Sequence, residues 1–202
     1  MALDLEEQEQ IANLKSFWNR FGKYILGVVT AALFAYAAMS AWNWYQRGQS
    51  AEAAKLYETL IGTLSKNDRD KTYLAADDLQ KKFGGTTYAA MGSLVAAKIA
   101  MDANDPAKAQ TFLKWTASKA SDDAYRALAQ MRLVGLLIDQ GSDAAMSEAD
   151  QILKAKAVSG FEPLWLERRG DWFLAQQKIA EARKQYLDAW KLMEKDKSFP
   201  ED

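Results

Sequence analysis

The sequence predicts an all-α chain, in which a single N-terminal transmembrane helix is followed by a solenoid of about four helix pairs. Two observations lead to this fold class. One stretch of 23 residues, 24–46, carries no charged side chain. The residues after it are dominated by Ala, Leu, Lys, Gln and Glu, which favour helices, and the whole chain has three prolines. The alternation of β-branched and aromatic residues that would predict strands is missing.

The uncharged stretch has the length of a membrane-spanning helix. About 20 apolar residues in an α-helix cross a bilayer core of roughly 30 Å. Tyr24 stands at its start and Trp42, Trp44 and Tyr45 close its end, as expected of aromatic rings at the headgroup level. We therefore expect a tail over residues 1–23, a transmembrane helix over 24–46 and a polar body over 47–202.

Two other interpretations of this stretch remain open at the level of sequence. A signal peptide has a shorter apolar core that ends at small residues, and Ala38-Met39-Ser40 would supply such a cleavage site. The stretch could also be a buried core helix of a globular protein. Its length and aromatic end favour an uncleaved anchor.

Lys and Arg near the span predict its orientation, because they tend to stay on the cytoplasmic side. Lys15, Arg20 and Lys23 precede the span, whereas Arg47 and the more distant Lys55 follow it. This bias predicts a cytoplasmic N-terminus and a body on the outer side.

The tail has an apolar face at helical spacing, formed by Ile11, Leu14, Phe17, Trp18 and Phe21. We expect a short helix that lies in the cytoplasmic membrane interface, in contact with lipid, and turns into the span at Gly22. A docking surface for another membrane protein would have the same pattern.

Within the span, small residues recur every four positions, at Gly27, Ala31 and Ala35. This spacing lets two membrane helices approach closely, so the three residues are candidates for contact with a partner helix. Because alanine is abundant in the stretch, the spacing could also be a coincidence.

Composition argues against catalysis and cofactors. Cys and His are absent, which excludes disulfides, thiol and Ser–His nucleophiles, and the usual zinc, copper and haem ligands. The adjacent acids Asp77-Asp78 and Asp122-Asp123 point about 100° apart on a helix, and Ser121 with the second pair is typical of a helix start. Lys and Arg number 26 against 27 Asp and Glu, without a basic stripe that would predict nucleic-acid binding. We predict no catalytic, cofactor-binding or metal-binding residues.

Turn signals divide the body into eight helical stretches. The expected breaks are at 66–70, 83–86, 104–106, 118–122, 141–143, 157–163 and 177–179.

The helices repeat. In the last pair, Gly170, Phe173, Ala182, Tyr186 and Ala189 alternate small and aromatic residues at the spacing of tetratricopeptide units, in which small residues meet where two helices cross. Two earlier units share this register, one with Ala97, Ala109 and Leu113, the other with Gly135, Ile138 and Ala149. Their starting positions are 38 and 35 residues apart, close to the period of about 34. A first pair near 50–65 and 71–83 matches only at alanines, as terminal repeats often do.

A tetratricopeptide stack presents a groove for polypeptide partners, and aromatic side chains are natural anchors there. The candidates are Phe161, Trp165, Trp172 and Tyr125. The alternative is that these side chains fill the core.

The order of these features resembles the YfgM-like proteins of Gram-negative bacteria. The resemblance is carried by Phe17-Trp18 after the acidic run 6–10, Gly22-Lys23, Trp42-Asn43-Trp44-Tyr45, Ala51 to Tyr57, Tyr88 to Met91, Arg132-Leu133 and Gly170-Asp171. It implies an inner-membrane protein with a periplasmic body, an ancillary subunit of the SecYEG translocon beside the chaperone PpiD, which would assist newly exported polypeptides. It offers no catalytic residues. A membrane-anchored scaffold for an unrelated envelope-biogenesis or signalling complex is the alternative function.

Overall fold

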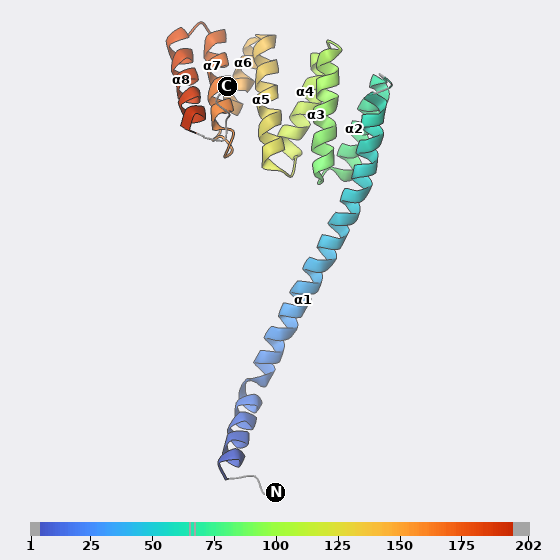
Figure 1. Ribbon diagram of the computed structural model, residues 1–202, viewed down its shortest axis with the longest axis vertical. Coiled ribbons are helices and arrows are strands. Elements are labelled where there is room, and N and C mark those ends of the chain that lie inside the picture. Colours follow the sequence, from blue (N-terminus) through green and yellow to red (C-terminus); the bar gives the residue numbers. More distant parts are fainter. Residues whose placement is uncertain (1–4, 65, 67, 196–202) are drawn as a thin grey trace. The chain divides into compact units, whose positions relative to one another are not determined.

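The computed structural model describes residues 5–64, 66 and 68–195, and this part of the chain forms eight α-helices and no strand (Figure 1). The start of the predicted tail and the end of the predicted body lie outside the described residues. The helices are α1 (Leu5–Leu64), α2 (Arg69–Phe83), α3 (Thr87–Asp102), α4 (Pro106–Lys119), α5 (Asp123–Gln140), α6 (Asp143–Leu153), α7 (Glu162–Ala175) and α8 (Ile179–Lys195). The all-α prediction is confirmed.

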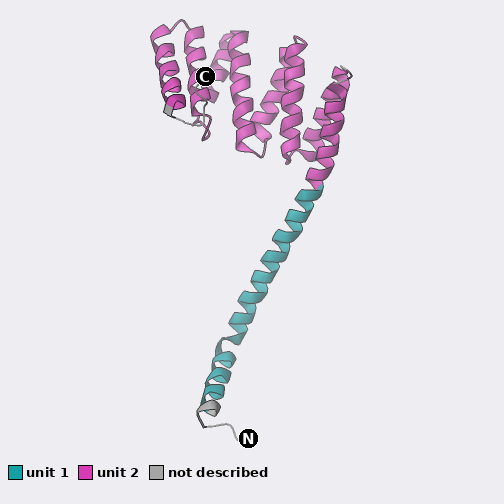
Figure 2. Cartoon of the chain, in the orientation of Figure 1, with its two compact units in different colours: residues 1–48 teal, residues 49–202 magenta. Residues whose placement is uncertain are grey.

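The chain divides into two compact units, residues 1–48 and 49–202 (Figure 2). Within the described residues, α1 holds the single stretch that is long and apolar enough to cross a membrane. None of its apolar window is buried inside the protein. Its large side chains are exposed, including Phe34 and Trp44 at 73% and 79%. The stretch is therefore not a core helix, and this interpretation is wrong.

The first unit differs from expectation at Gly22. We expected the chain to turn there, but α1 is continuous through this residue. A lone glycine lowers helix stability by only about 1 kcal/mol and does not break a helix as proline does. A Cβ added at Gly22 would lie 3.1 Å from the indole of Trp18, so the Trp18 ring covers the glycine one turn along the same helix.

Local capping explains where most body helices begin. Asp122 accepts hydrogen bonds from the backbone N–H groups of Ala124 and Tyr125, as predicted for this helix start. Asp105 caps α4, whose first residue is Pro106, and Ser142 caps α6. Gly141 ends α5 at a φ of +63°, in the left-handed region that glycine tolerates. One boundary differs, because α6 ends at Leu153, before the break expected at 157–163.

The body is a stack of helix pairs. Each helix from α2 onward packs against the next, and the odd-numbered helices also contact one another, α3 with α5 and α5 with α7. Figure 1 shows these helices following one another in chain order. This arrangement is a solenoid, with one layer of odd-numbered and one of even-numbered helices.

Alanines at the predicted crossing positions are buried. The relative exposures of Ala97, Ala109, Ala149, Ala182 and Ala189 are 3% or less. Small side chains let the helix axes approach, and leucines such as Leu133 and Leu137 fill the space around them.

The first pair, which matched the repeat poorly, is also packed. Ala53 and Ala76 are fully buried. A Cβ on Gly92 of α3 would lie 2.6 Å from Leu79, which shows how closely α3 approaches this pair. The hydroxyl groups of Thr63 and Thr72, 2.7 Å apart, form a buried hydrogen bond between α1 and α2.

Candidate interaction groove

The layer of odd-numbered helices is hollowed along the line between α3 and α5. A cavity of about 480 Å³ lies among α3, α5 and α7, and Leu113 of α4 also lines it. A second, of about 410 Å³, lies among the end of α1, α3 and α5. Both are lined by Lys98 and Arg132, so they form one groove, which we call the α3–α5 channel. The residues that line the channel include Tyr57, Met91, Leu94, Val95, Ala97, Lys98, Met101, Asp102, Tyr125, Leu128, Arg132, Gly135, Ile138 and Asp139.

One face of α5 forms a wall of the channel. Tyr125, Leu128, Arg132, Gly135 and Asp139 follow one another at intervals of three and four residues, which places them in a single stripe. Along the stripe, the aromatic ring of Tyr125 and the apolar side chain of Leu128 come first. The cation Arg132 and the anion Asp139 follow, and they are separated by Gly135, which has no side chain.

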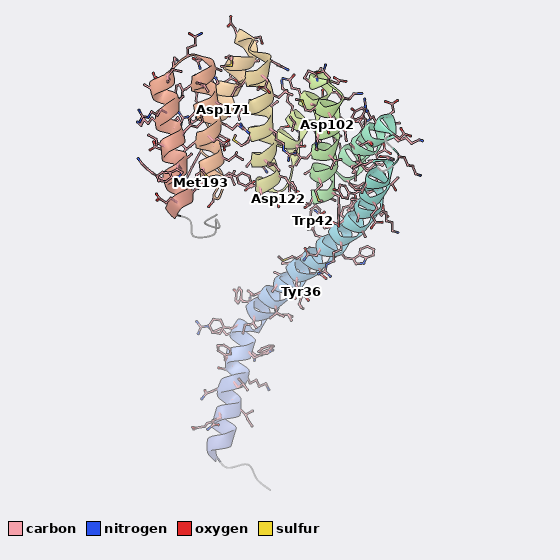
Figure 3. The ribbon with its side chains drawn as sticks, turned by 45° about the horizontal axis from the view of Figure 1, so that its top comes forward. Tyr36, Trp42, Asp102, Asp122, Asp171 and Met193 are labelled. Carbon is pink, nitrogen blue, oxygen red and sulfur yellow. The ribbon has the colours of Figure 1, made fainter. Side chains whose placement is uncertain are left out.

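The facing wall, on α3, has a matching order. Met91, Leu94 and Val95 line the cavity that contains Tyr125, whereas Met101 and Asp102 line the one that contains Asp139. The two helices therefore run in the same direction along the channel. In Figure 3, Asp102 and Asp171 lie toward one end of the body's helices and Asp122 toward the other, in agreement with this direction.

Most charges at the channel are paired within the protein. Lys98 Nζ lies 2.9 Å from Asp102 Oδ2 on the same helix, and Arg168 pairs with Asp171 on α7. Arg168 Nε is buried without a hydrogen-bond partner among the described residues. Arg132 and Asp139 are exposed, and neither forms an ion pair or hydrogen bond with another described residue. These two side chains are thus available to an external partner.

Tyrosines gather at the apolar end of the channel. The ring of Tyr57 packs against that of Tyr88, with centroids 5.7 Å apart. Burial raises the pKa of Tyr57, and the neighbouring Tyr125 raises it further. The Tyr57 hydroxyl is therefore a neutral donor and acceptor at ordinary pH, beside an apolar wall.

Of the four predicted groove residues, the structure places Tyr125 in the channel. Trp165 is only 4% exposed, and its Nε1 donates a 3.1 Å hydrogen bond to the carbonyl of Leu153. Trp172 is partly buried and donates from Nε1 to the carbonyl of Met146 at 3.0 Å. Phe161, partly buried, precedes α7. None of these three lines the channel; the two indoles are used in packing α7 against α6.

The sequence interpretation did not single out Arg132, Gly135 and Asp139 as channel residues. A signal was available, because the three lie at spacings of three and four on a helix whose first turn contains Tyr125. Their shared face becomes a channel only because α3 lies beside it.

The candidate contact residues of the span, Gly27, Ala31 and Ala35, are all exposed on α1. A Cβ on Gly27 would meet nothing within 4 Å, so a second helix has room to approach this side. Contact with a partner helix stays a prediction. Within the described part of the chain, no three acidic side chains converge on a potential metal site.

A stack of helix pairs with a groove along its odd-numbered layer, joined to one candidate membrane helix, defines a tetratricopeptide-like repeat protein. The family described as "Tetratricopeptide repeat-like domain" matches residues 15–200. A protein of Neisseria gonorrhoeae named "Ancillary SecYEG translocon subunit" is 32% identical over 199 residues, which cover 97% of this chain and 93% of that protein.

Proteins with the same name in Haemophilus influenzae and Escherichia coli are 27% and 25% identical. The matches cover 75% and 84% of this chain, and 74% and 80% of those proteins. The chain belongs to this family of ancillary SecYEG translocon subunits, the YfgM family. No solved structure matches it significantly.

Proposed function

We propose that the chain is a non-catalytic, single-pass inner-membrane adaptor of the SecYEG translocon, which acts with a PpiD-like chaperone to assist newly exported proteins. The observation that carries this proposal is the extent of the similarity. It covers 97% of the chain, and so includes both the apolar helix and the repeat body, in a relative named for the translocon. An adaptor needs both parts, one to stay at the membrane and one to bind.

The two parts have separate roles in this proposal. The tail lies in the cytoplasmic membrane interface, the span from 24 to 46 is retained, and the body is periplasmic. Gly27, Ala31 and Ala35 contact a helix of SecYEG or PpiD, while the channel of the body holds a polypeptide segment of a partner or client. The exposed aromatics of α1 and the available side chains of the channel support this division.

Co-purification tests the partnership directly. The full chain, extracted in mild detergent with its membrane partners, should bring down SecYEG and PpiD. The double variant Gly27→Leu and Ala31→Leu should recover less of both, because two large side chains would hold a partner helix away. Val28→Leu and Val29→Leu together make the matched control. Reproducible absence of SecYEG and PpiD from the unaltered chain would instead favour a scaffold for an unrelated envelope complex.

The proposed orientation can be tested because the chain has no Cys. Single cysteines at two exposed positions, Ser16→Cys in the tail and Ser147→Cys in the body, report the two sides of the membrane. In spheroplasts, a membrane-impermeant maleimide should label only the body cysteine, and lysis should expose both. Labelling of Ser16→Cys before lysis would contradict the proposed orientation, and a body released from the membrane would indicate cleavage near Ser40.

A further inference from the structure

On the basis of the function above, we propose that the α3–α5 channel accepts a helical, not an extended, segment of a protein partner. The segment presents a carboxylate to Arg132 and a basic side chain to Asp139, with a small residue between them.

We place the closest approach of the bound helix to α5 at Gly135, which lines the channel. This glycine is in the middle of α5, where glycine weakens a helix, and yet a Cβ built on it would meet nothing within 4 Å. Packing within the protein therefore does not require glycine here. Ala97, on α3, lines the same cavity. Ala97 is only 2% exposed, so it is Gly135, partly exposed and without a side chain, that leaves room for the backbone of a third helix to come close to the channel wall.

The chemistry of the walls favours a helix over an extended strand. An extended peptide that is buried in a groove needs donors and acceptors for its own N–H and C=O groups. Among the described residues that line the channel there is no Asn, Gln, Ser or Thr. Its polar groups are the hydroxyls of Tyr57 and Tyr125 and charged side chains, most of which are already paired within the protein, too few to serve the backbone of an extended segment along its whole length. A helix satisfies its backbone internally and needs only side-chain complementarity.

The dimensions suit a short helix. From Tyr125 to Asp139 the channel wall spans 15 residues of α5, and the two ends are about 21 Å apart at the helical rise. A partner helix of about four turns would fill this length.

The charges give the segment a direction. Arg132 and Asp139 are seven residues apart on α5, so they face the same side, about 10 Å from each other. Because neither is paired with another described residue, a partner with an acid and a base two turns apart would complement both. The apolar side chains of the partner would then meet Tyr57, Leu128 and Met91.

Two labelled synthetic peptides of about 18 residues serve as probes. The first peptide has two leucines, a glutamate, an alanine and a lysine in this order along one helix face, at heptad spacing. These side chains are meant for the apolar end of the channel, Arg132, Gly135 and Asp139. The second peptide has the same residues in reverse order. Versions with two central prolines cannot form the helix. Binding is measured by fluorescence anisotropy with the full chain in lipid nanodiscs, and empty nanodiscs give the background.

One of the two helical probes should bind at least about tenfold more tightly than its proline version, and the preferred order would give the direction of the bound helix. Equal binding of the proline version would overturn the helical assignment. Failure of both helical probes to bind would overturn the proposal as a whole.

Filling the channel tests its location. Gly135→Leu should weaken binding of the preferred probe by at least about tenfold, because the new side chain occupies the place where the bound helix comes closest to α5. Gly62→Leu is the matched control, since Gly62 is also a helical glycine whose added Cβ would meet nothing within 4 Å, but it lies outside the channel. Circular dichroism melts confirm that both variants are folded. Unchanged binding by Gly135→Leu would place the site elsewhere.

Charge reversal tests the recognition. Arg132→Glu should weaken binding of the probe about three- to tenfold at low salt. Replacing the probe's glutamate by lysine should restore binding to this variant. Absence of this rescue would overturn the assigned role of Arg132. Co-purification of SecYEG is measured separately on Gly135→Leu. Weakened peptide binding by Gly135→Leu with the translocon retained supports a channel site that is separate from the translocon contact. Unchanged peptide binding with the translocon retained refutes only the channel, whereas absence of the translocon from the unaltered chain refutes the adaptor function.

Discussion

Two glycines of the repeat, Gly170 on α7 and Gly135 on α5, were both predicted to lie where two helices cross, but their surroundings differ in the structure. A Cβ on Gly170 would overlap the ring of Tyr186, so α8 packs directly against the glycine. A Cβ on Gly135 would meet nothing within 4 Å, and this glycine lines the channel instead. The same small residue of the repeat therefore closes a helix pair at one place and keeps a groove open at another.

Leucine substitutions at Gly170 and Gly135 should give the largest difference in the free energy of unfolding. Gly170→Leu should lower the free energy of unfolding by about 3 kcal/mol or more, because the side chain enters space held by Tyr186. Gly135→Leu should change it by less than about 1 kcal/mol, since it gains helix propensity without a clash. Denaturant unfolding of the full chain in detergent, followed by circular dichroism, gives both values. Equal losses would abolish the distinction between the two glycines.

Gly170→Ala, alone and combined with Tyr186→Leu, tests whether the Tyr186 ring is what requires glycine at position 170. Gly170→Ala should cost about 1–3 kcal/mol of stability, because even one methyl group must displace the Tyr186 ring. In the Tyr186→Leu background the same change should cost much less, so the double-mutant cycle should show coupling. Additive effects would show that Tyr186 does not cause the penalty.

Gly135→Ala tests whether Gly135 is free of packing constraints within the protein. It should raise the free energy of unfolding by about 0.5–1 kcal/mol, because alanine is the better helix former and the site has room. The melting temperature of the full chain should rise accordingly. A loss of stability would mean that α5 needs glycine for a packing reason after all.

The pH dependence of the α7–α8 contact gives the smallest effect. Burial, and then the 2.8 Å hydrogen bond to Asp171, raise the pKa of Tyr186 to about 12. The folded-state pKa lies above the unfolded value of about 10, so this contribution is complete below about pH 10 and is lost as the pH rises through 12.

Tyr186→Phe should remove this dependence between about pH 10 and 12. The expected change is about 0.5 kcal/mol, because solvent screens a partly exposed group. Tyr125→Phe serves as the control in the same unfolding series, because the Tyr125 hydroxyl forms no hydrogen bond with another described residue. An identical decline in both variants would assign the effect to general titration of Tyr and Lys.

The helix pattern was predictable because its signals are local. Asp122 caps α5, Pro106 starts α4 and Gly141 ends α5, and each acts within one turn of the chain. The alanines of the repeat were predictable for a related reason, since a small residue every few turns is useful only where helices cross. Gly22 was misinterpreted because a glycine permits a turn without requiring one.

The groove was only partly predictable. Trp165 and Trp172 share a helix face, as the spacing indicated, but their Nε1 atoms donate to carbonyls of α6, and neither lines the channel. An aromatic residue at a surface and one in a core have the same spacing, and the neighbour that distinguishes them is distant in the sequence. Tyr125, one of the predicted candidates, lines the channel, and its contact with a partner stays a prediction; Arg132 and Asp139 were not among the candidates.

The sequence by itself determined the elements of this protein: an uncharged, membrane-length helix, the order and bounds of most body helices, their repeat, and a body without His or Cys. These depend on chain length, composition and capping within a few residues. Only the tertiary structure decided which face of α5 is open and that Gly135 lies in the α3–α5 channel while Gly170 lies against Tyr186. The reason is physical: burial depends on what packs opposite a residue, and for Gly135 the opposite wall comes from a helix some 40 residues earlier.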